Sequence, residues 1–219
     1  MTSLPQNTEL GLTRKLAWVS ALSFASGLPY GIVFLFVPTY LRDGPGADLS
    51  YITEVTSVAT FAWTLKFLWA FLIDRFGTRK RWILAMQFAL AALLLAAALV
   101  NPLLAAGLFA ATVIAIAYAS ATQDIAIDAY TISLFKEREL GPANSARVTA
   151  YRLAMIASSG LLVSFAGFTS WTTGLMTAAA LMLVLFGITL VLPETSASSA
   201  QVSLVDTIVK PFLDLLKLP

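Results

Sequence analysis

Four charged residues lie inside stretches of the chain that are otherwise apolar, namely Lys66, Asp124, Asp128 and Arg152. A charge at the centre of a membrane span costs about 2.5–3.5 kcal/mol on insertion scales, so such residues usually face a protein interior or a watery cavity. Burial and a neighbouring cation act in opposite directions on the protonation of a carboxylate. A carboxylate placed between these two influences can gain or lose a proton when the conformation changes, which is the chemistry of proton coupling.

The spacing of these four residues predicts that they meet at one depth. Lys66 and Asp128 each lie eight residues from a charged loop, which is ~12 Å along a helix. Asp124 lies one turn deeper than Asp128 on the same helix face, and Arg152 enters its stretch from the same side. We expect a neutral cluster in which Asp124 or Asp128 carries the proton. The two cations are then ion-pair partners or anchors for an anionic substrate, and the structural alternative is a static ion-pair lock.

The composition indicates which elements position these residues. Hydrophobic residues make up 58% of the 219-residue chain and charged residues 12%, and the mean hydropathy is +0.82. A soluble domain carries about 25% charged residues, so the chain belongs in lipid. A helix needs roughly 20 apolar residues to cross the hydrocarbon core. The sequence therefore predicts an all-α membrane protein with six transmembrane helices, in residues 16–41, 55–73, 82–123 (two, joined at Asn101-Pro102) and 153–193 (two, divided near 167–173).

The basic residues predict the orientation. Lysine and arginine in short loops are retained on the cytoplasmic side of a membrane. One side of the six-span arrangement holds nearly all of them: Arg14, Lys15, Arg75, Arg79, Lys80, Arg81, Lys136, Arg138, Arg147, Lys210 and Lys217. We therefore expect a multi-pass membrane protein with both termini in the cytoplasm. The same placement explains the pI of about 9.0 without a nucleic-acid partner.

Three regions follow from this arrangement. Residues 1–14 are expected to be a cytoplasmic tail and residues 15–193 the six-helix bundle. Residues 194–219 are expected to be a cytoplasmic linker with an amphipathic helix at the membrane interface, because apolar residues recur there at helical spacing between two lysines. The start of a further span is the alternative for this last region.

A second polar feature lies near the middle of the first span. Pro29 removes a backbone hydrogen bond and the neighbouring glycines loosen the helix, so we expect a kink or break there. Broken helices at the bilayer midplane commonly line substrate sites, and the alternative is a packing kink. Aromatic residues could offer a surface to a sugar or peptide, although they are more often core or lipid-facing. The candidate substrate pathway comprises Gly27, Pro29, Tyr30, Trp63, Tyr118 and Gln123.

Several motifs together carry a family resemblance. The loop Asp-Arg-Phe-Gly-Thr-Arg-Lys at 74–80 resembles the signature between the second and third helices of the major facilitator superfamily, with Ala70 in place of the usual glycine. Further segments are similar to the AmpG-type muropeptide permeases, with the acetyl-coenzyme A transporters as a neighbouring branch. They are Phe-Ala-Ser-Gly-Leu-Pro at 24–29, Lys-Phe-Leu-Trp at 66–69, Ser-Ala-Thr-Gln-Asp-Ile at 120–125 with Asp-Ala at 128–129, and Tyr-Arg-Leu at 151–153.

The resemblance covers most of residues 15–193 and implies the amino-terminal six-helix half of a twelve-helix transporter. Such a transporter uses the proton gradient to bring anhydro-muropeptides across the bacterial inner membrane, in a cavity between two six-helix halves. Its partners are the solute, the proton, the lipid bilayer, and a second half or second chain. The resemblance also implies a conformational latch at Asp74, Arg75, Gly77, Arg79 and Lys80. A purely topological anchor is the alternative for this loop.

Two other functional classes remain as alternatives. Asp124 and Asp128 lie one turn apart and could share Mg²⁺ in an intramembrane transferase. The spans contain no further carboxylate pair, however, and the chain has no histidine or cysteine, so it lacks the common soft metal ligands and nucleophile–base pairs. We therefore expect neither a metal nor a cofactor. The third class is a non-transporting half-protein or assembly subunit.

Overall fold

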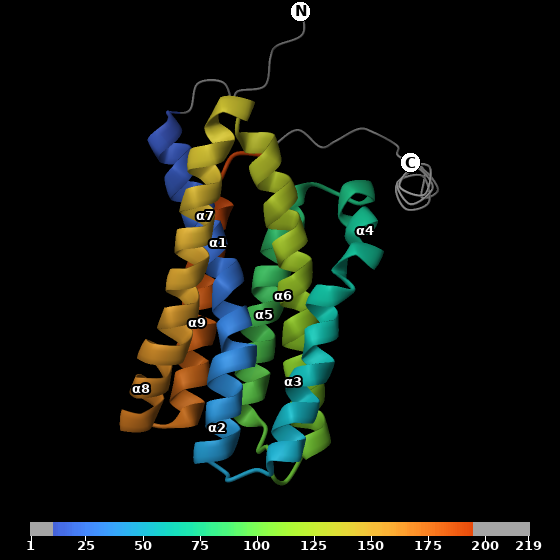
Figure 1. Ribbon diagram of the computed structural model, residues 1–219, viewed down its shortest axis with the longest axis vertical. Coiled ribbons are helices and arrows are strands. Elements are labelled where there is room, and N and C mark those ends of the chain that lie inside the picture. The colour runs from blue at the N-terminus through green and yellow to red at the C-terminus, as the bar shows by residue number, and fades with distance from the viewer. Residues whose placement is uncertain (1–10, 195–219) are drawn as a thin grey trace, which may run out of the picture.

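The computed structural model describes residues 11–194, apart from the side chain of Asp74. Within that range the chain is a bundle of helices that run up and down along one long axis (Figure 1). Five helical segments are long and apolar enough to cross a membrane: Leu12–Asp43, Arg79–Leu99, Ala106–Leu134, Glu137–Phe168 and Trp171–Leu190. The prediction of an all-helical membrane protein is confirmed, although the second predicted span is not one continuous helix. The predicted linker beyond residue 194 lies outside the described residues.

The first span does not break at Pro29. It consists of α1 (Leu12–Gly31), a π-helical segment (Ile32–Phe36) and α2 (Val37–Asp43). Pro29 lies inside α1, and the Ile32 N–H donates to the carbonyl oxygens of both Leu28 and Pro29. Proline removes one backbone donor from the helix, and the wider π turn that follows it keeps the chain helical. The break expected from the sequence is therefore replaced by a local widening.

The second span is interrupted instead. It consists of α3 (Leu49–Thr64), a 3₁₀ turn (Lys66–Leu68) and α4 (Ala70–Arg75), and Leu65 and Trp69 between these segments have ψ near 0°. The interruption contains neither proline nor glycine, so no local rule predicts it. Its side chains reach across to the neighbouring helix α6 (Ala106–Leu134), where the Trp69 indole donates to Thr122 Oγ1 at 3.1 Å. Tertiary contacts therefore accompany this break.

The third and fourth spans form a helical hairpin. Before α5 (Arg79–Leu99), Gly77 has φ +76°, which disfavours residues with a side chain, and Thr78 Oγ1 caps the helix by accepting from Arg81 N–H. Between α5 and α6, Asn101 Oδ1 accepts from the Leu103 N–H at 2.9 Å. A short polar side chain that accepts from the backbone two residues later stabilises a turn. The turn predicted at Asn101-Pro102 is present.

The fifth span begins earlier than its charge-free stretch suggested, and the sixth begins at the division predicted near residues 167–173. A 3₁₀ turn (Glu137–Glu139) leads into α7 (Leu140–Ile156), a second π-helical segment (Ala157–Leu161) and α8 (Leu162–Phe168). After a short connection, Ser170 Oγ caps α9 (Trp171–Leu190). The fifth span therefore starts well before residue 153, the residue at which its charge-free stretch begins.

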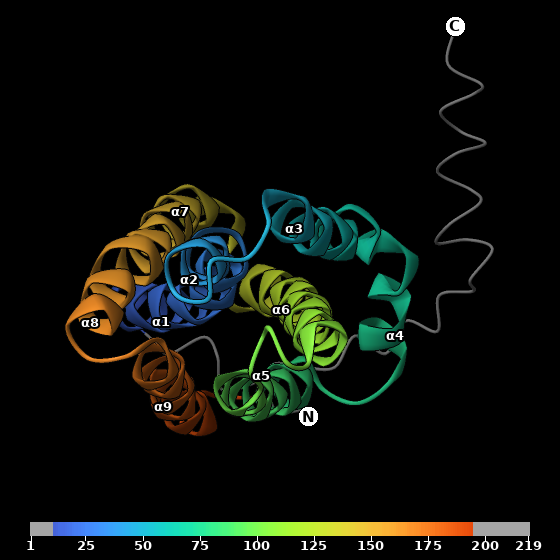
Figure 2. The same cartoon turned by 90° about the horizontal axis from the view of Figure 1, so that it is seen from below.

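Helices α1 and α6 lie near the centre of the bundle, as the end-on view in Figure 2 shows. The first span packs most extensively against α7, and the two π-helical segments meet at this interface. Gly27 permits the close approach, because a Cβ atom there would lie 2.6 Å from the Tyr151 carbonyl oxygen. Helices α5, α6 and α9 form the neighbouring part of the bundle.

The buried apolar side chains form two separate clusters. The smaller cluster, which we call the basic-end core, consists of Val19, Leu22, Ile73, Ile83, Ala126, Ile127, Tyr130, Leu134, Phe135, Ala143 and Leu192. The larger cluster, the distal core, includes Leu28, Phe36, Ala62, Leu90, Ala121, Ala154 and Met182. At the basic end, the buried Lys15 pairs with Glu139 at 2.8 Å and ties α1 to the connection before α7. Polar residues lie between the two clusters.

Candidate functional site

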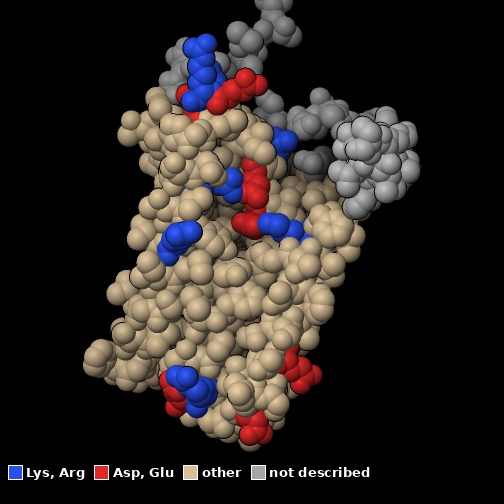
Figure 3. All heavy atoms as spheres, in the orientation of Figure 1, with Lys and Arg blue, Asp and Glu red and all other residues tan. Residues whose placement is uncertain are grey.

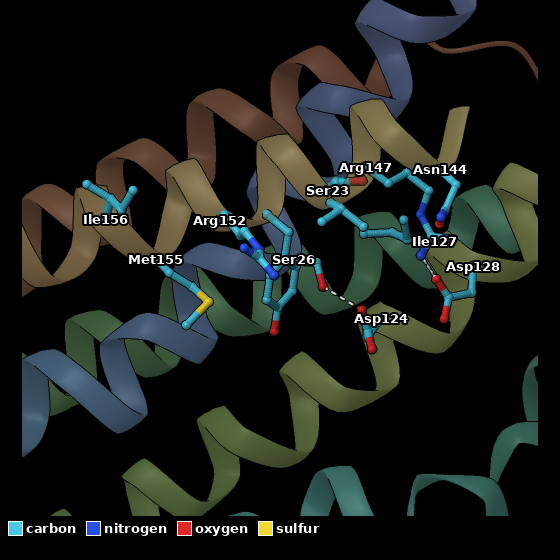
Figure 4. Close-up of a pocket in the computed structure, with 12 residues that line it drawn as sticks. Ser23, Ser26, Asp124, Ile127, Asp128, Asn144, Arg147, Arg152, Met155 and Ile156 are labelled. Carbon is cyan, nitrogen blue, oxygen red and sulfur yellow. Dashed lines mark hydrogen bonds and ion pairs between the residues drawn. The ribbon is translucent and has the colours of Figure 1, made fainter. Parts of the chain in front are cut away.

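A cavity of about 680 Å³ opens between α1, α6 and α7 (Figure 4). Helix α7 supplies most of its wall. The residues that line it are Ser23, Ser26, Asp124, Ile127, Asp128, Asn144, Arg147, Val148, Tyr151, Arg152, Met155 and Ile156. Three of the four charged residues predicted to cluster lie on this wall, and the fourth, Lys66, reaches one of them. The cavity therefore has a charged inner surface within a bundle whose outside is mostly apolar.

The centre of the site is an ion pair between the second span and α6. Lys66 Nζ lies 2.6 Å from Asp124 Oδ2, and Ser26 Oγ of α1 donates to Asp124 Oδ1 at 2.8 Å. The side chain of Asp124 is 18% exposed and that of Lys66 32%. Charge-assisted hydrogen bonds are stronger than neutral ones, so Lys66 and Ser26 tie the Asp124 carboxylate of α6 firmly to two other spans. The interruption of the second span places Lys66 at its break.

The second carboxylate has a different partner from the one the sequence suggested. Asp128 pairs with Arg147 of α7 (Figure 4), not with Lys66 or Arg152. Sequence analysis assigned Arg147 to a loop because the charge-free stretch begins only at residue 153, whereas the helix begins at Leu140. The signal in the sequence was the recurrence of alanine at helical spacing before the charge-free stretch, at Ala143, Ala146 and Ala150. The structure thus forms two neighbouring ion pairs rather than one four-membered cluster.

Arg152 is exposed on α7 and lines the cavity. Among the residues that the structure describes, it has no ion-pair or hydrogen-bond partner. Figure 4 shows its side chain projecting toward the same space as Ser26 and Asp124. Arginine presents a planar fork of donors that matches a carboxylate. The cavity therefore offers one cation that is not neutralised by a described carboxylate.

The predicted pathway residues of α1 and α6 are buried rather than cavity-lining. Gly27 and Pro29 are buried in α1, with Gly27 against the α7 backbone. Gln123 is 0% exposed, and both of its amide atoms lack a hydrogen-bond partner in the described part of the chain. None of the three is among the residues that line the cavity.

The predicted aromatic residues belong to two groups of ring contacts. The centroid of the Tyr30 ring lies 5.1 Å from the ring centroid of Trp63 and 5.8 Å from that of Tyr151. Tyr118 of α6 is 39% exposed and lies 5.4 Å from Trp69. Tyr30 and Trp63 thus join the first span to the second beside the cavity wall, while Tyr118 lies at the break of the second span.

The loop predicted as a latch lies at the basic end of the bundle. Arg75 ends α4 and stacks over the Phe76 ring, and Arg79 and Lys80 open α5. Lys80 Nζ donates to the carbonyl oxygens of Leu190 and Leu192, at 2.9 and 2.5 Å. A cation at the carboxyl end of a helix complements its dipole and its free carbonyls. Lys80 therefore binds α5 to the end of α9, whereas the side chain of Asp74 lies outside the described atoms.

Replacing Lys80 with methionine should loosen the end of α9. Hydrogen bonds to charged groups contribute about 1.5–3 kcal/mol, so we expect the Val191 and Leu192 amides to exchange with deuterium about tenfold faster. Arg81→Met is the matched control, because Arg81 is exposed on the same turn. Equal exchange in wild type and Lys80→Met, measured by mass spectrometry, would contradict this capping role.

The charges are distributed along the long axis as a membrane requires. Figure 3 shows charged side chains at the two ends and a further group in the upper half of this face. The lower end carries Arg42, Asp43, Asp48 and Glu54, of which Arg42 and Asp43 form an exposed pair. The site therefore lies in the half of the bundle that is nearer to the basic end.

Comparisons with known proteins place these features in context. A family model described as Major Facilitator Superfamily matches residues 19–219. An uncharacterised protein of Haemophilus influenzae is 37% identical over 187 residues, which cover 83% of this chain and 44% of that protein. The anhydromuropeptide permease of Escherichia coli K12 is 32% identical over 200 residues, which cover 88% of this chain and 40% of that protein. A Rickettsia conorii protein named as a transporter, AmpG 4, is 27% identical over 219 residues, which cover 93% of this chain and 52% of that protein. The chain thus spans about half the length, or less, of these curated relatives.

Proposed function

Because the chain belongs to the major facilitator superfamily, we propose that it forms the amino-terminal six-span half of a proton-coupled permease. The family resemblance inferred from the motifs is confirmed by the match over residues 19–219. The solute we propose is an anhydro-muropeptide or a similar cell-wall-derived compound, since one relative is named for that solute. The protein would lie in a bacterial inner membrane with its basic end and both termini in the cytoplasm, as the distribution of lysine and arginine favours.

The observation that carries this proposal is the Lys66–Asp124 pair at the wall of the cavity. Asp124 is held at 2.6 Å by Lys66 and at 2.8 Å by Ser26, which belong to two other spans. A movement of any of these spans changes the distance between the cation and the carboxylate, and so changes the affinity of Asp124 for a proton. We therefore propose Asp124, which is less exposed than Asp128, as the proton carrier.

Arg152 supports an anionic solute. It lines the cavity, and it has no counter-charge among the described residues. A solute carboxylate would supply that counter-charge, because arginine binds carboxylates through two parallel hydrogen bonds. The peptide part of a muropeptide carries such carboxylates.

A second helical body would complete the solute pathway. In the most apolar segment of the span Glu137–Phe168 only 22% of the residues are buried inside the bundle, and Arg152 lies on this span. A charged residue that faces lipid is costly, so we propose that a second six-span half, or a second chain, covers α7 and closes the cavity. For residues 194–219 the proposal stays a cytoplasmic linker with an amphipathic helix.

The alternative of a magnesium-dependent transferase finds no support in the geometry. Asp124 and Asp128 each have their own cation, Lys66 and Arg147. The described residues contain no group of three or more histidine, cysteine, aspartate or glutamate side chains that could hold a metal ion. The superfamily match indicates a permease rather than an enzyme.

Uptake into membrane vesicles tests the proposed function. The chain is expressed together with its proposed second six-span half in an Escherichia coli strain that lacks its own anhydromuropeptide permease. Right-side-out vesicles from this strain receive a radiolabelled anhydro-muropeptide under an imposed pH gradient. We expect accumulation that a protonophore abolishes. Vesicles from the same strain with an empty vector give the baseline. Uptake at that baseline, or accumulation that resists the protonophore, would contradict the proposal.

A further inference from the structure

Polar residues lie between the basic-end core and the distal core on five of the six spans. On α1 the basic-end core ends at Leu22 and the distal core begins at Leu28, and on α5 the corresponding residues are Ile83 and Leu90. The polar or charged residues that lie between the two cores are Ser23 and Ser26 on α1, Lys66 in the second span, Gln87 on α5, Gln123 and Asp124 on α6, and Arg147 and Arg152 on α7. The bundle thus contains a transverse polar layer at the level of the Lys66–Asp124 pair.

Part of this layer is buried and unpaired. Gln87 and Gln123 are each 0% exposed, and neither the amide nitrogen nor the amide oxygen of either residue has a partner within residues 11–194. The Ser23 hydroxyl, in a residue that is 3% exposed, is likewise unpaired there. Buried polar groups in native proteins are almost always hydrogen-bonded, to protein or to ordered water. These atoms therefore require a partner that is not a described side chain or backbone group.

The two amides belong to neighbouring helices. Helices α5 and α6 are antiparallel neighbours that pack against each other along their length. Gln87 lies eight residues from the start of α5 and Gln123 eleven from the end of α6, which places them ~12 and ~17 Å from the basic ends of their helices. Two amides supply two acceptor oxygens and two NH₂ donors. A buried water molecule makes about three hydrogen bonds and needs a polar, roomy site.

We propose that Gln87 and Gln123 bind a buried cluster of water molecules within the polar layer that contains the Lys66–Asp124 pair. Ser23, which lines the cavity while its hydroxyl is buried, marks where this cluster approaches the cavity. Water fits better than a cation, because the amides are neutral and the adjacent Asp124 charge is already paired with Lys66. The water site itself does not depend on transport activity.

The consequence for Asp124 rests on the proposed function. A carboxylate that neighbours internal water can exchange a proton from the bundle side as well as from the cavity. Gln123 precedes Asp124 directly in α6, so water bound to its amide lies near the proposed proton carrier.

Nuclear magnetic resonance of the purified protein in lipid nanodiscs tests the water site without any transport assay. The probe is water itself, detected by cross-peaks to the side-chain NH₂ groups after ¹⁵N-glutamine labelling. The sequence contains four glutamines, and the variants Gln87→Leu and Gln123→Leu assign the two signals. We expect long-lived water cross-peaks to both buried amides in the wild type, and at least a tenfold weaker cross-peak to Gln123 in Gln87→Leu.

Phe88→Leu is the matched control, because Phe88 follows Gln87 on α5 but its side chain is 61% exposed. It should leave both cross-peaks unchanged. Absence of water cross-peaks to both amides in the folded wild type would overturn the proposal, and this measurement needs no variant to fold. Cross-peaks that appear only when Na⁺ is present would overturn it in favour of a cation. A Gln123 cross-peak unaffected by Gln87→Leu would show that the two amides do not share water.

Discussion

Asp124→Asn should abolish accumulation of solute driven by a pH gradient while leaving solute exchange across the membrane. Asparagine can still accept the Ser26 hydrogen bond, but its NH₂ group faces the Lys66 ammonium, which is also a donor. The side chain can no longer carry a proton, so the energetic coupling is lost although a route for the solute persists. We therefore expect concentrative uptake to fall to the level of vesicles that lack the protein, while solute exchange continues.

The measurement compares two assays on the same vesicles, proton-driven accumulation and counterflow of preloaded solute. Asp43→Asn is the matched control, because Asp43 forms an ion pair with Arg42 that is exposed at the opposite end. Surface pairs of this kind contribute about 0–1 kcal/mol, so uptake should stay near wild type. Accumulation by Asp124→Asn at the wild-type level would rule out Asp124 as the proton carrier. Equal loss in both assays would indicate a structural role for the pair instead.

Gly27→Ala should destabilise the bundle, although the same substitution usually stabilises a helix. Alanine is favoured over glycine by about 0.8–1.0 kcal/mol in helix interiors. At Gly27, however, the new Cβ atom would lie 2.6 Å from the Tyr151 carbonyl oxygen and 3.0 Å from Ala154 Cβ. Overpacking of this kind costs about 1–3 kcal/mol. Since the obstacle is backbone, α1 and α7 must move apart, which also displaces Ser26 from Asp124.

Thermal unfolding in detergent measures this effect against Gly187→Ala as the control. Gly187 lies within α9 and a Cβ atom there meets nothing within 4 Å, so its replacement should leave the midpoint unchanged or raise it. The midpoint of Gly27→Ala should fall. A second pair sharpens the test, because the obstacle at Gly31 is chiefly the side chain of Ser158. Ser158→Gly should therefore rescue Gly31→Ala, and a Gly27→Ala midpoint at or above wild type would refute the close-packing account.

Much of the architecture could be predicted because lipid restricts the choices. A span must satisfy its backbone hydrogen bonds internally and present apolar side chains outward, so long uncharged stretches predict helices with little ambiguity. The turn at Asn101-Pro102 and the placement of basic residues at one end followed from the same local chemistry. The limits of the spans were harder to predict. Helix α7 begins at Leu140, because helical hydrogen bonding continues past charged residues such as Arg147.

The interruptions of the helices show why local rules were insufficient. Pro29 predicted a break in the first span, but packing against α7 keeps the chain helical with a π turn after it. The second span breaks at Leu65 and Trp69 without a proline or glycine, where Lys66 and Trp69 hydrogen-bond to α6. A side chain that pairs across the bundle can outweigh one backbone hydrogen bond, and the sequence of one span does not reveal its partner.

The sequence by itself determined that this is a helical membrane protein and which end is basic, and it predicted that Lys66, Asp124, Asp128 and Arg152 lie in the half of the spans nearer that end. These properties depend on residue type and on distance along a helix axis, which the 1.5 Å rise fixes. Only the tertiary structure decided that Asp124 pairs with Lys66 and Ser26, that Asp128 pairs with Arg147, and that Gln87 and Gln123 are buried without a described partner. Partner choice depends on the rotation and separation of packed helices, and these are set by close contacts such as Gly27 against Tyr151.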